Sequence, residues 1–68
     1  MNKPYTAYVI RNTERRQYLD TSKAGNHWGP FFASSVYDNR QAADRISANI
    51  NSSAGRDLSQ VVSVRFTK

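Results

Sequence analysis

Residues 36–50 constrain the fold of this chain most strongly, because they have the spacing of a short amphipathic helix. Asp38 is predicted to be the N-cap, and Gln41 follows three residues later, as in a capping box. A helix with such a narrow apolar stripe is not stable by itself in water. It must therefore pack against other elements of the chain. The apolar residues at helical spacing are Ala42, Ala43, Ile46 and Ile50.

Three segments are predicted to be strands, and the helix is expected to pack on the sheet that they form. Residues 5–11 are rich in β-branched and aromatic side chains, and residues 15–20 form the returning strand of a hairpin. Residues 60–67 form the last strand, which is expected to pair beside the first. The sequence therefore predicts one domain over residues 1–68. Its fold class is α+β, a small antiparallel or mixed sheet of three or four strands with one helix on one face.

Alternation along each strand predicts which side chains face the helix. The helix-facing set is predicted to be Tyr8, Ile10, Leu19, Val62, Val64 and Phe66. The opposite face is predicted to carry Tyr5, Val9, Arg11, Arg16, Tyr18, Val61 and Arg65.

The connecting segments carry most of the glycine and proline. Trp28 lies in a turn-rich stretch over residues 21–30 and is either a core plug or a binding anchor, with burial favouring the plug. Residues 31–36 are expected to be extended, with one of Phe31 and Phe32 buried. Residues 51–55 are expected to end the helix, and Gly55 suits a left-handed position there.

Composition limits the class of protein. The 68 residues contain no cysteine, so neither disulfides nor a cysteine-based metal site can stabilise the small core. There is no apolar run of about 20 residues and no secretory h-region, so we expect a cytoplasmic protein without a membrane partner. The net charge of +5 either favours anionic partners or simply serves solubility.

We do not expect an enzyme, a metal site or a cofactor. His27 is the one imidazole, and the nearby hydroxyls of Ser22, Ser34 and Ser35 carry no nucleophile motif. The glycines are isolated, so there is no phosphate-binding loop. The acidic residues are too scattered for paired-carboxylate chemistry or for a metal: Glu14, Asp20, Asp38, Asp44 and Asp57.

The remaining candidate is a binding surface of tyrosines and arginines on the sheet face away from the helix. Such a surface can stack bases and neutralise phosphates, or bind a protein through favoured anchor residues. It can also be an ordinary solvated sheet face stabilised by cross-strand pairs. The predicted binding residues are Tyr5, Arg11, Arg15, Arg16, Tyr18 and Arg65.

The order of these features resembles small accessory proteins of bacteriophages and prophages, some anti-CRISPR proteins among them. The resemblance rests on Tyr8-Val9-Ile10, Tyr18-Leu19, the Trp28 loop, Ala33-x-x-x-Tyr37, the helix with Ala42, Ala43 and Ile46, and a valine-rich last strand. It implies a non-catalytic protein that binds a host component in the host cytoplasm, and it assigns no role to any residue.

Three functions remain open at this point. The first is a phage-type protein that binds and inhibits or modulates a host protein or nucleoprotein complex, with an anti-CRISPR-like inhibitor as its sharpest form. The alternative is direct binding of DNA or RNA by the open sheet face. The third is self-assembly, in which an unprotected edge at residues 60–67 pairs between chains so that the protein is a homodimer rather than a monomer.

Overall fold

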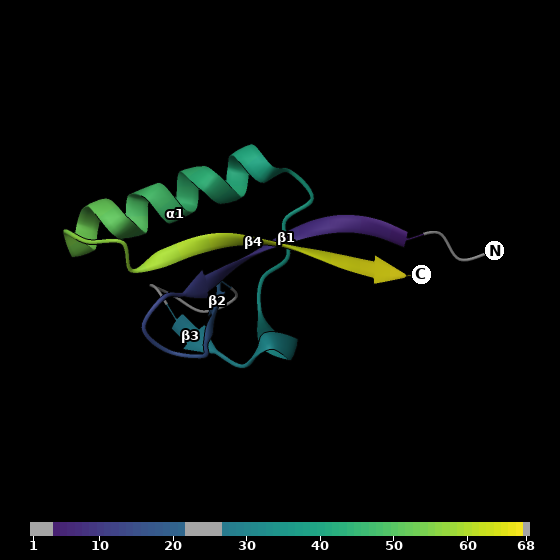
Figure 1. Cartoon of the computed structure of the whole chain (residues 1–68), viewed down its shortest axis with the longest axis horizontal. Coiled ribbons are helices and arrows are strands. Elements are labelled where there is room, and N and C mark those ends of the chain that lie inside the picture. Colours follow the sequence, from purple (N-terminus) through teal and green to yellow (C-terminus); the bar gives the residue numbers. More distant parts are fainter. Residues whose placement is uncertain (1–3, 22–26, 68) are drawn as a thin grey trace.

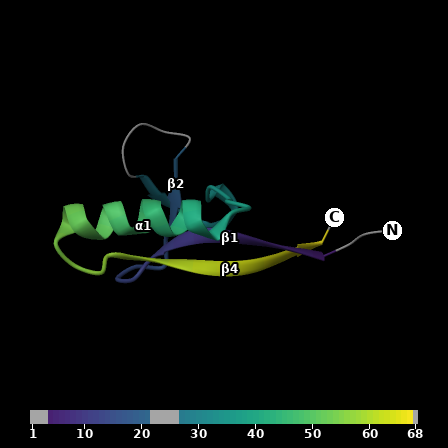
Figure 2. The same ribbon diagram turned by 90° about the horizontal axis from the view of Figure 1, so that it is seen from above.

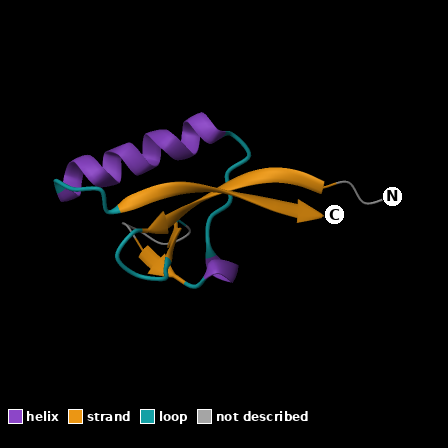
Figure 3. Cartoon of the chain, in the orientation of Figure 1, coloured by secondary structure: helices purple, strands orange, loops and turns teal. Residues whose placement is uncertain are grey.

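The computed structural model describes residues 4–21 and 27–67, which form a four-stranded antiparallel sheet with a helix against one face (Figure 1). The strand order is β3-β2-β1-β4, and the predicted α+β fold is confirmed. Figure 3 distinguishes the helices from the strands. The elements are β1 (Pro4–Asn12), β2 (Tyr18–Asp20), β3 (His27–Gly29), the short 3₁₀ helix η1 (Phe31–Ala33), α1 (Arg40–Ala54) and β4 (Ser59–Thr67).

The two long strands, β1 and β4, form the body of the sheet. They pair antiparallel over their whole length, from Pro4 opposite Thr67 to Asn12 opposite Ser59, so the predicted pairing of first and last strands is confirmed. β2 joins β1 at Arg11 opposite Tyr18. The predicted return strand over residues 15–20 is therefore too long at its start. The side chain of Asn12 explains this, since it accepts hydrogen bonds from the two backbone N–H groups of Glu14 and Arg15 (2.8 and 3.0 Å) and holds them in a turn.

The segment after η1 bonds to both β2 and β1 before it reaches the helix. The N–H of Ser35 donates to the carbonyl of Leu19 (2.9 Å). Tyr37 and Tyr8 then exchange two backbone hydrogen bonds of 2.7 and 2.8 Å. This segment carries the chain from the η1 side of the sheet to the α1 side, as Figure 1 shows.

α1 begins one residue later and ends four residues later than predicted. Its N-cap is Asn39, not Asp38: the Asn39 side chain accepts from the N–H of Gln41 (2.8 Å). Residues 51–54 continue the helix instead of ending it, because Asn51 and Ala54 are half-buried and extend the inward stripe. Gly55 is the C-cap at a φ of 70°, so the left-handed position predicted for it is confirmed.

The core lies between α1 and the sheet. Trp28 packs against it from β3, so the core plug predicted for this side chain is the observed arrangement, although the ring stays half-exposed. Ala42 is exposed, and Ser47 takes its place on the buried stripe. The buried cluster is Ile10, Leu19, Ala43 and Ile50, against which Tyr8, Trp28, Tyr37, Ile46, Leu58 and Val61 pack.

The predicted faces of β4 are wrong. Residues directly opposite in an antiparallel pair share a face, and Val61 stands opposite Ile10, whose side chain is in the core. Arg65 stands opposite Thr6 on that same side. Valines occupy both phases of β4, at 61 and at 62, so hydrophobicity alone does not decide its orientation. The residues displaced to the face away from α1 are Val62, Val64 and Phe66.

Candidate functional site

The sheet face away from α1 carries a pair of stacked rings near the ends of the long strands. Tyr5 on β1 and Phe66 on β4 have ring centroids 5.5 Å apart at an interplanar angle of 25°. Farther along β1, Ala7 and Val9 lie on the same face and have no exposed area. This face is therefore covered at its centre and is not the open sheet platform that the sequence predicts.

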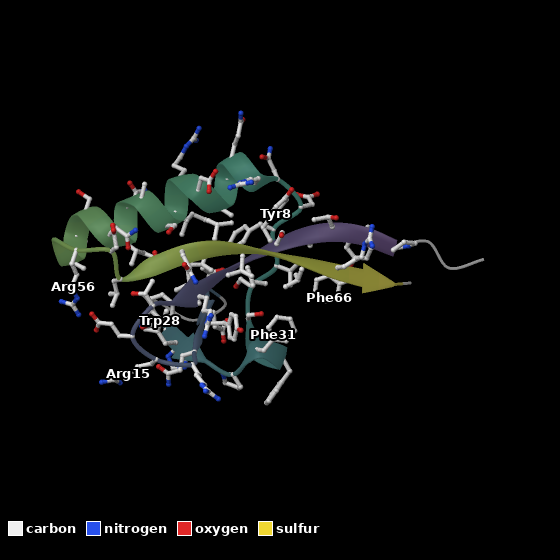
Figure 4. All side chains as sticks on the ribbon, viewed as in Figure 1. Tyr8, Arg15, Trp28, Phe31, Arg56 and Phe66 are labelled. Atoms are coloured by element: carbon white, nitrogen blue, oxygen red, sulfur yellow. The ribbon has the colours of Figure 1, made fainter. Side chains whose placement is uncertain are left out.

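A second ring pair lies where η1 meets the sheet. Tyr18 stands opposite Arg11, so its ring is on the face away from α1, and the ring of Phe31 packs edge-on against it at 5.1 Å. Figure 4 shows Phe31 and Phe66 on this same side of the molecule. η1 thus contributes an aromatic side chain to the face that lacks the helix.

Four large apolar side chains remain exposed in the described part of the chain. Phe32 is 90% exposed and Phe31 is 43% exposed, so the prediction that one of them is buried is wrong. η1 explains this, because the amide and hydroxyl of Ser34 both donate to the carbonyl of Phe31 (3.0 and 2.6 Å), which holds a tight turn with no buried residue. Val36 is 50% exposed and Tyr5 is 40% exposed.

Val36 lies on the same side as these rings. Its neighbour Tyr37 is the bridge partner of Tyr8 and packs into the core on the α1 side. Successive side chains of an extended segment alternate, so Val36 points away from α1. We call these side chains, together with the exposed Phe32 next to Phe31 on η1, the apolar surface: Tyr5, Tyr18, Phe31, Phe32, Val36 and Phe66.

The six predicted binding residues do not all come together. Tyr5, Arg11 and Tyr18 share the face away from α1, as predicted. Arg15 and Arg16 are exposed in the loop between β1 and β2 rather than on a strand, and Figure 4 shows Arg15 there. Arg65 lies on the opposite face of the sheet and does not belong to this site.

The arginines near the apolar surface keep their charge free. Between described residues the ion pairs are Arg40 with Asp44 (3.6 Å) and Arg56 with Glu14 (2.7 Å). Within that part of the chain, Arg11, Arg15 and Arg16 form no ion pair. The Nε of Arg11 is also buried, and it has no hydrogen-bond acceptor among the described residues. Arg11 therefore combines an unneutralised charge with an unused donor beside Tyr18.

The loop between β1 and β2 is held by the pair of Glu14 and Arg56. Two guanidinium nitrogens of Arg56 donate to the two carboxylate oxygens of Glu14, at 2.7 and 3.1 Å. This hydrogen bonding, more than the charge of Arg56, lowers the pKa of Glu14 below its usual 4.5. The charge of Arg15 also lowers the pKa of Glu14, so this one acid of the loop faces Arg56 as well as Arg15, and the loop keeps an excess of positive charge.

The groups considered for catalysis lie apart or are already bonded. His27 is exposed on β3, the Ser34 hydroxyl donates to the backbone, and the Ser35 hydroxyl bonds to that of Thr21 (2.7 Å). Ser22 lies outside the described residues. Residues 4–21 and 27–67 contain no group of three side chains suited to hold a metal ion. No helix in these ranges is long and apolar enough to cross a membrane.

Sequence reasoning missed Phe31, Phe32 and Val36. The available signal for exposure was the pair of adjacent phenylalanines directly after Gly29-Pro30. Two consecutive large side chains in a tight turn point in different directions, so they cannot both enter one core. No family model, curated protein or solved structure matches this chain.

Proposed function

We propose that this chain is a non-catalytic accessory protein of phage type that binds a host protein complex and inhibits or modulates it. The apolar surface is the proposed contact, with Arg11, Arg15 and Arg16 at its border. The choice of a host complex as target rests on the resemblance described above. The choice of the apolar surface as the contact rests on the exposed side chains described above.

One observation carries the proposal: Phe32 is 90% exposed in a chain whose buried core is very small. Leaving a phenylalanine in water forgoes the roughly 1.5–3 kcal/mol that its burial contributes to stability. Exposed aromatic side chains clustered on one side are typical of protein-binding surfaces, where they become the buried anchors of the interface.

The arrangement of the rings favours a protein partner over single-stranded nucleic acid. Base stacking requires an open ring face. Four of the five rings of the apolar surface already contact each other, Tyr5 with Phe66 and Phe31 with Tyr18. Only Phe32 has no ring contact among the described residues, so the surface lacks a row of open rings for successive bases. The free arginines at the border would complement acidic residues around an apolar patch on the partner.

Capture from a bacterial lysate tests the proposal. The immobilised protein is compared with Phe32→Asp and with Asn49→Asp, which makes the same charge change at an exposed position of α1. The lysate is treated with nuclease, and retained proteins are quantified by mass spectrometry. We expect one set of proteins to be retained by the wild type and Asn49→Asp and lost with Phe32→Asp. Equal retention by all three baits would refute the apolar surface as the binding site.

Direct binding of DNA or RNA is the second candidate, favoured by the two unpaired arginines of the β1–β2 loop and the net charge of +5. It is tested by titrating labelled single- and double-stranded DNA and RNA at low and at physiological salt. Phosphate contacts require a steep fall in affinity with salt, which Arg15→Gln with Arg16→Gln would make shallower.

A further inference from the structure

β4 forms one border of the sheet, with its outer edge facing away from β1. The strand has nine residues and pairs on its inner side with all of β1. In the view from above (Figure 2), β4 is the outermost strand of the sheet. No strand among the described residues pairs with its outer side, so this edge can accept a further strand.

The hydrogen bonds of Tyr8 reveal which backbone groups of β4 point outward. The N–H and the C=O of Tyr8 both bond to Tyr37, on the side of β1 away from β4. Tyr8 and Ser63 are thus a non-hydrogen-bonded pair, and both backbone groups of Ser63 point outward. By alternation, the same holds for Ser59, Val61 and Arg65.

At one end of this edge the outward groups are already occupied. The Ser59 N–H donates to Oδ1 of Asn51 (2.8 Å), and Nδ2 of Asn51 donates to the Ser59 carbonyl (3.1 Å). The side chain of Asn51 therefore occupies the position of a neighbouring strand at Ser59. Of the remaining outward groups, those of Val61, Ser63 and Arg65 are centred on Ser63, and those of Thr67 lie beyond them at the end of the strand.

This open stretch lacks the usual protection of an edge strand. It contains no proline and no lysine, and its unbroken register with β1 contains no bulge. Its one charged residue is Arg65. The stretch is also symmetric about Ser63, because Val62 and Val64 flank it.

We propose that a second copy of this chain pairs antiparallel with β4 about a two-fold axis at Ser63. Ser63 then exchanges two backbone hydrogen bonds with Ser63 of the second copy, and Val61 does the same with Arg65 of the second copy. Val62 lies opposite Val64 of the second copy, which makes two equivalent cross-strand valine pairs. The contact is isologous and closes at two chains.

The chemistry of the strand favours a second copy as the occupant. The open backbone groups of Val61, Ser63 and Arg65 find their complements under the two-fold operation, and no two like charges lie directly opposite each other. Asn51 ends the pairing at each end of the shared edge, because its side chain already bonds both backbone groups of Ser59 in each copy. The result is a continuous sheet of eight strands with both helices on one face. This inference uses the strand edge and is independent of the proposed binding function.

A charge swap at the symmetry axis tests the inference. Ser63 is exposed, so Ser63→Lys and Ser63→Glu leave the core unchanged, and circular dichroism checks the fold of each variant. In sedimentation velocity over a concentration series, we expect the apparent mass of the wild type to rise from the 7.7 kDa of the monomer toward that of a dimer. Each variant alone should dissociate up to about fivefold more readily, and an equimolar mixture should recover the dimer.

Asn49→Lys and Asn49→Glu are the matched controls, since they make the same charge changes on the exposed side of α1. Both should dimerise as the wild type does. A wild type that stays monomeric at every concentration overturns the inference. So do Ser63 variants that dimerise normally on their own.

A crosslink gives a second readout that does not depend on charge. The chain has no cysteine, so Ser63→Cys introduces a single thiol. Directly opposite residues of a hydrogen-bonded pair have Cα atoms about 5.5 Å apart, which suits a disulfide. We expect mild oxidation to link Ser63→Cys into covalent dimers and to leave Ser53→Cys, on exposed α1 surface, largely unlinked. Equal crosslinking of both variants contradicts the two-fold pairing.

Discussion

Asn51 and Ser59 are joined side chain to backbone in the way that two neighbouring strands are joined. The carboxamide of Asn51 accepts from the Ser59 N–H and donates to the Ser59 carbonyl. The hydroxyl of Ser59 is also bonded, to the hydroxyl of Ser47 one helical turn earlier (2.7 Å). These polar bonds join the last turns of α1 to the start of β4, beside the apolar contacts of Ile50 and Leu58 in the core.

Asn51→Ala should therefore lower the free energy of unfolding by about 1–3 kcal/mol, because both backbone groups of Ser59 lose their hydrogen-bond partners. Asn49→Ala, on the exposed side of the same helix, should change it by less than about 0.5 kcal/mol. Urea denaturation of the three proteins measures the difference. Equal stability of the two variants would show that the Asn51 bonds are replaced by water at no cost.

Gly55→Ala should destabilise the protein by about 1–2 kcal/mol, because a residue with a Cβ is strained at its φ of 70°. A Cβ added at Gly55 meets nothing within 4 Å, so the cost comes from the backbone alone. Gly29→Ala is the control, since a Cβ there is equally free of contacts and its φ is not left-handed. Thermal unfolding should show a lower midpoint for Gly55→Ala only.

Leu19→Ala should cost about 2–5 kcal/mol in unfolding free energy, because Leu19 is 1% exposed at the centre of the core. Phe32→Ala should leave stability within about 0.5 kcal/mol of the wild type, because its side chain is 90% exposed. Chemical denaturation of both variants checks this. A large loss of stability with Phe32→Ala would mean that Phe32 serves the fold and not a partner.

The stability contributed by Glu14 should depend on pH. The hydrogen bonds from Arg56 lower the pKa of Glu14 in the folded chain, so the folded state binds the proton more weakly than the unfolded state does. The contribution is therefore complete above the unfolded pKa near 4.5 and is lost as the pH falls through the lower folded pKa.

Glu14→Gln should accordingly be slightly less stable than the wild type at neutral pH and equally stable in strong acid. The difference is small because both partners are exposed and solvent screens the pair. Urea midpoints measured over a pH series test this. A gap that persists unchanged into acid would show that the carboxylate charge is not its source.

The elements with strong local patterns were predictable from the sequence. Alternation located the two long strands, and the apolar repeat located α1 apart from its ends. The hairpin pattern also located β2, apart from its start. The short strand β3 and the turn η1 depend on tertiary contacts, such as the pairing of Trp28 with Leu19, which leave no local signature. The N-cap was misassigned because Asp38 and Asn39 are adjacent and both suit that position.

The candidate site was predictable only in part. Tyr5, Arg11 and Tyr18 follow from alternation along strands whose faces differ in polarity. Arg65 was misplaced with the rest of β4, because valines at 61, 62 and 64 fit either face to the core. The exposed phenylalanines of η1 were missed because burial is the default expectation for so apolar a residue.

The salt dependence of partner retention tests the proposed function most directly. Proteins captured from nuclease-treated lysate are eluted with increasing NaCl from the wild type and from Phe32→Asp. We predict that the wild type retains its partner with little dependence on salt and that Phe32→Asp retains none, as an apolar contact requires. Retention that falls steeply with salt and is unaffected by Phe32→Asp would contradict the account and assign binding to the arginines instead.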